Sequence, residues 1–305
     1  RAAIRGNFFL RIAGFDAIPI VNVEGACASG TIAMREAILA IASGTSKVVL
    51  AVGSEKLYLD DTTRSIKAMA SNTDVELEGA LGFQFPASYA MTLRKYMKKF
   101  GWTQEHFAKV ASKNKYNGSL NPVAQYQKPM SVKDILHSRV ICWPITLYMC
   151  STMSDGAAAA ILCSKDVIKN MTVNNPPIRV EACCLRSGES IAEDDGQIRV
   201  AKDAYEMSSI GPEEIEVAEV HDAMAPGELF RIEKLGFCKA EDMEKRINEG
   251  YFSLSGKLPV NTSGGLTARG HPIGATGLAQ LAEIIYQVRG QAGKQHVKLR
   301  RSLYP

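Results

Sequence analysis

Long apolar runs and one-sided charge are both missing from this sequence. No run approaches the roughly 18 residues that a transmembrane helix needs, and no signal peptide is recognisable. Lys and Arg number 36 and Asp and Glu 32, so the net charge is only +4, with neither an acidic tail nor a basic block. We therefore expect no membrane span and no nucleic-acid partner.

A cysteine framework is also missing. The seven cysteines are odd in number and scattered through apolar stretches, which disfavours a set of disulfides. No pair has metal-ligand spacing with histidines nearby, so we expect no metal site. This usage predicts an intracellular, reducing compartment.

The length of 305 residues predicts about two domains at roughly 150 residues each. Hydrophobic residues make up 46% of the chain and charged residues 22%, as in an ordinary globular protein. The chain opens on Arg1 and closes soon after a helical pattern, with no terminal strand visible. We therefore expect it to be a fragment.

The most informative stretch is VNVEGACASGTIAMREAILAIASGTSKVVLAVGSEKL, residues 21–57. Residues 18–23 form a short β-branched run, and from Cys27 the apolar period changes to that of a helix. Gly44 is the expected helix stop, and residues 47–52 read as a second, buried strand. The pattern predicts a βαβ unit with Cys27 where strand becomes helix.

Cys27 is a candidate nucleophile because of that position. Backbone N–H groups at a helix N-terminus are unpaired and carry partial positive charge, which stabilises a thiolate. The thiolate is the nucleophilic form of cysteine, and the small residues around Cys27 would let a substrate approach. The alternative is that Cys27 is a small core residue in a crowded turn.

The rest of the chain divides into a helical insertion and a second half. Residues 58–150 predict an inserted, mostly helical lobe, and NNPP at 174–177 is the best linker, so we expect halves at 1–173 and 174–305. Expected helices cover 87–100, 103–114, 131–136, 197–207, 226–235 and 278–288; expected strands cover 154–165, 178–184 and 215–220; residues 117–130 are expected to be a loop.

Two histidines stand at informative places. His221 ends the expected strand at 215–220, and His271 lies in the glycine-rich loop GGLTARGHPIGATG before a helix. Histidine exchanges protons near neutral pH, and such a loop permits close approach of a ligand. Either histidine is alternatively a hydrogen-bonded structural residue. The others, His106, His137 and His296, are expected at the surface.

Four segments together resemble the thiolase superfamily. They are VNVEGACASG, SDGAAAAIL, VHDAMAPGEL and NTSGGLTARGHPIGATGLAQ, in that order, and they span nearly the whole chain. The nearest branch in character is the sterol-carrier-protein-type thiolases. The resemblance implies an α/β fold with five layers, αβαβα, built from two similar halves, with the inserted helical lobe in the first. It also implies a homodimer or homotetramer, located in the cytoplasm of a prokaryote or in a peroxisome or mitochondrion of a eukaryote.

The resemblance implies a role for individual residues. Cys27 would accept the acyl group of a 3-ketoacyl-CoA, with coenzyme A as co-substrate and no tightly bound cofactor. His271 would activate Cys27 and point into an oxyanion hole, to which His221 would contribute. Ser151, Met224 and Gly274 would contact the substrate or the CoA arm.

One departure leaves rival functions open. Sterol-carrier-type thiolases commonly carry the motif His-Asp-Cys-Phe, whose cysteine is the second acid/base, and this chain has Ala223 there. The first rival is a thiolase-like subunit that works with a small OB-fold partner and cleaves carbon–carbon bonds by retro-aldol chemistry. The second is a non-catalytic scaffold that binds acyl-CoA or lipid.

Overall fold

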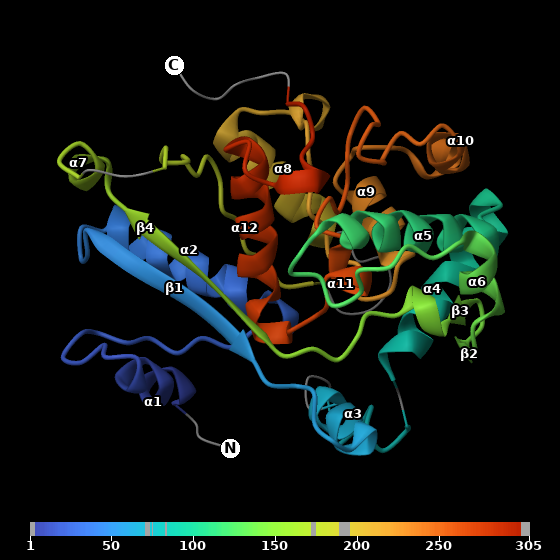
Figure 1. Cartoon of the computed structure of the whole chain (residues 1–305), viewed down its shortest axis with the longest axis horizontal. Helices are drawn as coiled ribbons and strands as arrows, with labels where there is room; N and C mark the ends of the chain where they lie inside the picture. Colours follow the sequence, from blue (N-terminus) through green and yellow to red (C-terminus); the bar gives the residue numbers. More distant parts are fainter. Residues whose placement is uncertain are drawn as a thin grey trace.

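Helices dominate the part of the chain that the computed structural model describes, which is residues 4–70, 74, 76–82, 84–171, 175–188 and 196–299 (Figure 1). None of the helices described there is both long and apolar enough to cross a membrane. The α-helices are α1 (Arg5–Ile12), α2 (Ser29–Ala42), α3 (Thr62–Ala70), α4 (Phe85–Phe100), α5 (Gln104–Leu120), α6 (Val132–His137), α7 (Lys165–Ile168), α8 (Gly196–Ser208), α9 (Gly227–Lys234), α10 (Met243–Asn248), α11 (Gly265–Ala268) and α12 (Thr276–Val288). The strands are β1 (Val48–Glu55), β2 (Val140–Cys142), β3 (Ile145–Thr146) and β4 (Gly156–Cys163).

The expected helix after Cys27 and the strand that follows it are both present. α2 ends at Ala42, and Gly44 then adopts a φ of +75°, which glycine takes without steric cost. β1 pairs antiparallel with β4, from Val48 opposite Cys163 to Glu55 opposite Gly156. α2 and α12 cover one face of this ribbon (Figure 1), where the buried core is Met34, Ala37, Ala51 and Leu278.

Three strand predictions were wrong or only partly right. Within the described residues no ladder includes 18–23 or 178–184, and 215–220 makes only a single bridge, between Ala218 and Val260. A strand exists only where a neighbour completes its hydrogen bonds. Within 215–220, Ala218 alone exchanges backbone hydrogen bonds with residues 259–261, and no described segment forms a ladder with 18–23 or 178–184. The second face of the β1–β4 ribbon is likewise open, so Leu50 and Ile161 are 36% and 73% exposed rather than buried.

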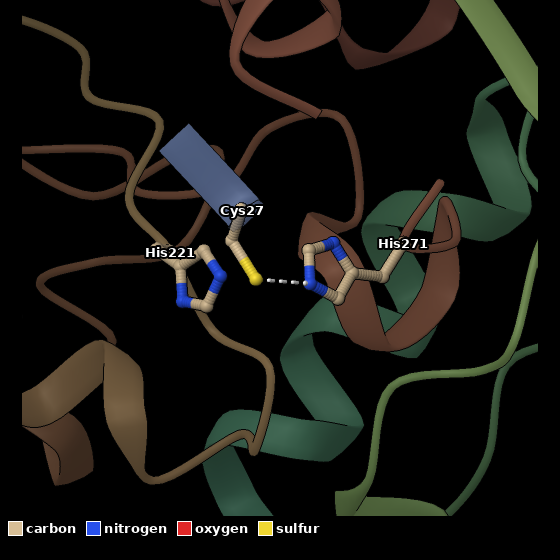
Figure 2. A group of neighbouring side chains, drawn as sticks. All are labelled: Cys27, His221 and His271. Carbon is tan, nitrogen blue, oxygen red and sulfur yellow. Dashed lines mark hydrogen bonds between the residues drawn. The ribbon is translucent and has the colours of Figure 1, made fainter. Parts of the chain in front are cut away.

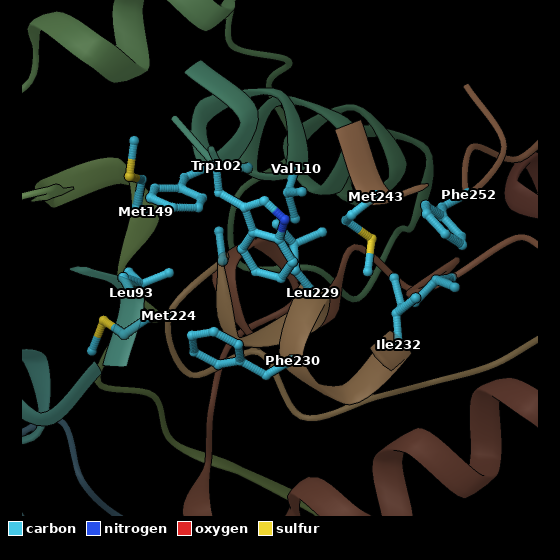
Figure 3. Packing of buried hydrophobic residues seen from close by; sticks show 14 of the residues in the cluster. Leu93, Trp102, Val110, Met149, Met224, Leu229, Phe230, Ile232, Met243 and Phe252 are labelled. Atoms are coloured by element: carbon cyan, nitrogen blue, oxygen red, sulfur yellow. The ribbon is translucent and has the colours of Figure 1, made fainter. Parts of the chain in front are cut away.

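The region 58–150 is mostly helical, as expected, and α5 runs on to Leu120 before the loop begins. Its apolar side chains share one core with α9 and α10 (Figure 3). Trp102 stacks on Phe230 with ring centroids 6.1 Å apart, and its indole N–H donates to the carbonyl of Ala240 over 3.0 Å. The helical region and the C-terminal half are therefore packed on one another.

His106 is buried, with 5% exposure, and the expectation of a surface histidine was wrong. Its ring Nδ1 accepts the backbone N–H of Thr103 over 3.1 Å, while the Thr103 hydroxyl accepts the N–H of His106. The ring thus takes the place that Glu or Gln usually fills in a capping box. The capping bond directs the ring back toward the start of the helix instead of out into solvent.

A buried polar cluster lies behind the loop that carries His221. Glu228 is fully buried and forms an ion pair with Lys113 over 2.9 Å. Its carboxylate also accepts amide hydrogens from Asn114 and Asn261. Removing one member of such a cluster leaves the other groups buried without their partner.

Glu228→Ala is expected to lower the free energy of unfolding by about 3–5 kcal/mol, because Lys113 would keep a buried charge without its counter-ion. Urea denaturation measures the change. The matched control is Glu206→Ala, which breaks the exposed Lys202–Glu206 pair and should change stability by no more than about 0.5 kcal/mol. Equal losses of stability in the two variants would contradict the role of Glu228 as a buried partner of Lys113.

Candidate active site

Cys27 lies in a tight turn that leads directly into α2. Residues Ala26–Ala28 form one 3₁₀ turn, and Ala26 has a φ of +50°, unusual for a residue with a side chain. The carboxylate of Glu24 accepts the backbone N–H groups of Gly25 and Ala26 over 3.0 and 2.9 Å. Glu24 therefore holds the turn in place, a role that the sequence analysis did not identify.

The segment from Met149 to Ser154 holds both histidine loops. The N–H of Ser151 donates to the carbonyl of Ala223, and the N–H of Ala225 donates to that of Met149, over 2.8 and 2.7 Å. Further along, the Ser154 hydroxyl accepts the N–H of His271 over 3.1 Å. The loops of His221 and His271, 50 residues apart in sequence, are thus fixed to one short segment.

Glycines let the His271 loop come close to the Cys27 turn. A Cβ on Gly53 in β1 would lie 2.3 Å from the carbonyl oxygen of Gly274, and one on Gly277 would lie 2.8 Å from the backbone nitrogen of Thr31 in α2. Real Cβ atoms do not approach backbone atoms so closely. The glycine content of the GHPIGATG segment therefore serves backbone-to-backbone packing on β1 and α2.

The three candidate residues meet at one point (Figure 2). The sulfur of Cys27 lies between the two imidazole rings, 3.3 Å from Nε2 of His271. The rings of His221 and His271 are nearly perpendicular, at 83°, with centroids 5.1 Å apart. One ligand-type atom from each residue lies within 4.8 Å of the other two. The structure thus brings together all three residues that the sequence singled out.

The hydrogen bonds of Thr276 fix the tautomer of His271. The Thr276 hydroxyl donates to the carbonyl of Pro272 over 3.0 Å, and it lies 2.7 Å from Nδ1 of His271. A hydroxyl has one hydrogen, so the Nδ1–H must donate to Thr276. Nε2 then carries the lone pair that faces the thiol of Cys27, which is the arrangement of a base beside a nucleophile.

Burial decides the charge state of the site. It raises the pKa of the Cys27 thiol to about 11, against the lowering effects of its own backbone N–H and of Arg231. It lowers the pKa of His271 to about 3 and that of His221 to about 4. All three groups are therefore neutral at pH 7. The backbone N–H of the turn does lower the pKa of the Cys27 thiol, as the sequence analysis expects, but loss of water raises it by more.

His221 differs from His271 in having no internal partner. Neither ring nitrogen hydrogen bonds within the described structure, although both are buried. A buried donor without an acceptor costs about 1–3 kcal/mol, so a ring with no internal partner needs an explanation, and hydrogen bonding to a bound substrate supplies one. Arg231, near enough to lower the pKa of both His221 and Cys27, is a further charged neighbour that the sequence analysis missed.

The three residues expected to contact substrate are placed differently from one another. Ser151 is half-buried and stands beside the His221 loop through its bond to Ala223. Met224 is buried, with 6% exposure, and its backbone pairs with that of Cys150 in an isolated antiparallel β-bridge. Gly274 donates its N–H to the carboxylate of Glu55 and packs on the backbone of β1. Of these three residues, Ser151 is the one with a polar side chain for contact with a substrate.

Comparison with known proteins gives consistent matches over nearly the whole chain. The thiolase N-terminal domain matches residues 7–140, and the thiolase C-terminal domain-like family matches residues 187–304. The acetyl-CoA acetyltransferase of Methanothermobacter thermautotrophicus is 39% identical, over 94% of this chain and 76% of its own length. Sterol carrier protein 2 of Bos taurus is 34% identical over 93% of this chain, which spans 55% of that protein.

A solved structure agrees with these matches. The Ltp2-ChsH2(DUF35) aldolase superposes with a TM-score of 0.75 and 26% identity, over 90% of this chain and 73% of that one. The α/β fold expected from the resemblance and the kinship with sterol-carrier-type thiolases are both confirmed. The chain is a member of the thiolase family.

Proposed function

We propose that the chain is an acyl-CoA acyltransferase of the thiolase type that works through an acyl thioester on Cys27. It would cleave a 3-ketoacyl-CoA with CoA, or run the reverse Claisen condensation, with CoA as co-substrate. One observation carries the proposal: the Cys27 sulfur lies 3.3 Å from Nε2 of His271. The acetyl-CoA acetyltransferase named above supports the reaction class.

In the first half-reaction, Cys27 attacks the 3-keto carbon as its proton moves to Nε2 of His271. Because both groups are neutral at rest, this transfer must accompany the attack. The bond between C2 and C3 of the substrate then breaks, and its electron pair remains on C2 as the enolate of acetyl-CoA. The enolate takes up one proton and leaves, and the acyl group stays on Cys27.

In the second half-reaction, the thiol of CoA attacks the acyl thioester. Its proton passes through His271 back to Cys27, and the shortened acyl-CoA leaves. The products of the two half-reactions together are acetyl-CoA and the shortened acyl-CoA. The sum consumes one 3-ketoacyl-CoA and one CoA. Negative charge develops on a thioester oxygen in both halves. The one N–H of the neutral His221 ring, which has no partner within the described structure, is suited to donate a hydrogen bond to it.

Position 223 carries alanine, so that side chain cannot supply the proton for C2. His271 holds the proton that Cys27 released, and we assign the delivery of that proton to the same imidazole. The proposal therefore uses one base where many thiolases use a second acid/base. The sequence analysis found alanine at position 223 but identified no residue to carry this proton.

Several narrower assignments belong to the same proposal. Ser151 would contact the pantetheine arm. Met224 and Gly274 would contact the substrate or the CoA arm through their backbone atoms. The chain would act as a homodimer or homotetramer in a reducing, intracellular compartment. We further propose the halves 1–173 and 174–305, with the helical lobe at about 58–150 inserted in the first.

A second candidate function is a partner-dependent carbon–carbon lyase that works by retro-aldol cleavage. The similarity to the Ltp2-ChsH2(DUF35) aldolase favours it, and so does Ala223. In that case a small OB-fold partner would complete the active unit. A retro-aldol reaction needs no acyl group on Cys27, and this difference separates the two candidates.

The test is thiolysis by the chain without any partner. Purified protein is incubated with CoA and a series of 3-ketoacyl-CoA esters, and acetyl-CoA is followed by liquid chromatography and mass spectrometry. Turnover that depends on CoA supports the acyltransferase. Cleavage of a 3-hydroxyacyl-CoA to an aldehyde or ketone, with no thiolysis of any ester, would instead support the lyase.

Thr276→Val is expected to lower kcat/KM for thiolysis by about 10-fold to 100-fold, because the Nδ1–H of His271 loses its acceptor and the neutral ring can take the other tautomer. Thr276→Ser keeps the hydroxyl and should restore most of the rate. Steady-state kinetics measures both. If valine and serine gave the same rate, the tautomer assignment would be wrong.

A further inference from the structure

Cys27, His221 and His271 also have the composition and spacing of a metal site. Thiolate sulfur and imidazole nitrogen are the ligands that Zn²⁺ prefers in proteins. In a tetrahedral zinc site with bonds of about 2.0–2.3 Å, ligand atoms lie roughly 3.3–3.8 Å apart. The contact from Cys27 Sγ to His271 Nε2 is already 3.3 Å, and the three ligand atoms all lie within 4.8 Å of one another. Small side-chain rotations would close the remaining gap.

The lone pairs needed for coordination are available. The bond from Nδ1–H to Thr276 leaves Nε2 of His271 facing Cys27, which is how metal-binding histidines are usually oriented. Neither ring nitrogen of His221 has a hydrogen bond within the described structure, so no bond must break for it to turn to a metal.

The donor set also selects among metals. One thiolate and two imidazoles suit zinc, whereas Mg²⁺ and Ca²⁺ require oxygen ligands. Three protein ligands leave one tetrahedral position for water, as in open zinc sites.

We propose that Cys27, His221 and His271 bind one Zn²⁺ and that the bound metal reversibly blocks Cys27. On binding, the thiol gives its proton to solvent and the sulfur forms a bond to the metal; no redox change occurs. Removing the metal with a chelator restores the thiol. The binding step follows from the side-chain geometry alone, whereas inhibition of acyl transfer rests on the proposed function.

Cobalt is the probe, because Co²⁺ takes the same tetrahedral site and is coloured. Protein stripped with chelator is titrated with Co²⁺ without oxygen, and then with Zn²⁺. We expect one equivalent of cobalt, a thiolate-to-cobalt charge-transfer band, strong visible bands typical of tetrahedral geometry, and loss of all of these on addition of zinc.

Two variants test the ligands, and two others serve as matched controls. Cys27→Ser should abolish the charge-transfer band, and His221→Gln should weaken binding at least about 10-fold. Cys238→Ser and the exposed-site variant His137→Gln should leave the titration unchanged. Circular dichroism shows whether each variant folds, and two independent ligand variants keep the test valid if one of them does not.

A charge-transfer band that persists in Cys27→Ser, or cobalt spectra that are weak and octahedral, would overturn the site. The result is separable from the proposed function. Metal binding by a protein without thiolysis would uphold the site and contradict the function. Thiolysis that zinc does not inhibit, with no tetrahedral cobalt spectrum, would contradict the metal site and uphold the proposed function.

Discussion

Cys27→Ala is expected to reduce acyl transfer to the uncatalysed background, a loss of at least about 10³-fold in kcat, because the thiol that would carry the acyl group is removed from beside His271. Stability should change by no more than about 1 kcal/mol, because the side chain is small and half-buried in the turn. Thiolysis kinetics and urea denaturation measure the two effects.

The matched control is Cys238→Ala, a half-buried cysteine after α9 whose sulfur donates to the carbonyl of the next residue. This variant should keep full activity. If Cys27→Ala retained thiolysis within about 10-fold of the parent protein, the covalent mechanism would have to be abandoned.

Gly53→Ala is expected to lower the free energy of unfolding by about 3 kcal/mol and kcat/KM by about 100-fold. The new Cβ would stand 2.3 Å from the carbonyl oxygen of Gly274 and 2.9 Å from Cα of Ala275, so the turn after His271 must move away from β1. A displacement of about 1 Å at a catalytic base costs about 10²-fold in rate.

Gly211→Ala is the control, since the nearest atoms to its new Cβ belong to the carboxylate end of Glu213, a flexible side chain that can turn aside. We expect a change within about 0.5 kcal/mol and no change in rate. Denaturation and kinetics run on both variants decide the matter. Should Gly53→Ala prove as stable and as active as the parent, close packing of β1 on the His271 loop does not position the base.

The parts of the site that lie within short motifs could be predicted from the sequence. Helix α2 and its glycine stop follow from local periodicity and from the φ that Gly44 must adopt. Cys27, His221 and His271 each stand where a strand-like or loop segment precedes a helix, and the structure brings them together. The motifs around them were specific enough to identify the family.

The strand predictions failed because a strand depends on partners far away in the sequence. Residues 18–23 and 178–184 have the right composition, yet nothing in the described residues pairs with them in a ladder. The prediction that these two strands, β1 and β4, are buried failed for a similar reason, because local hydrophobicity does not say whether a second layer covers the sheet.

The supporting residues could not be identified from sequence because their roles arise from tertiary contacts. Thr276 matters only once the loop folds so that its hydroxyl meets the imidazole of His271. The charge state of Cys27 depends on how deeply the fold buries it, and here burial outweighs the helix terminus. The positions of Cys27, His221 and His271 in the chain were local properties, whereas their charge states and supporting contacts were not.

The most direct test is to find the residue that becomes acylated. The protein is incubated with acetyl-CoA or a longer 3-ketoacyl-CoA, and then analysed by intact mass and by peptide mass spectrometry. The account predicts one acyl group on the peptide that contains Cys27, with release of the matching free product, and no label in Cys27→Ala. An unmodified Cys27 in protein that is turning over substrate would contradict it.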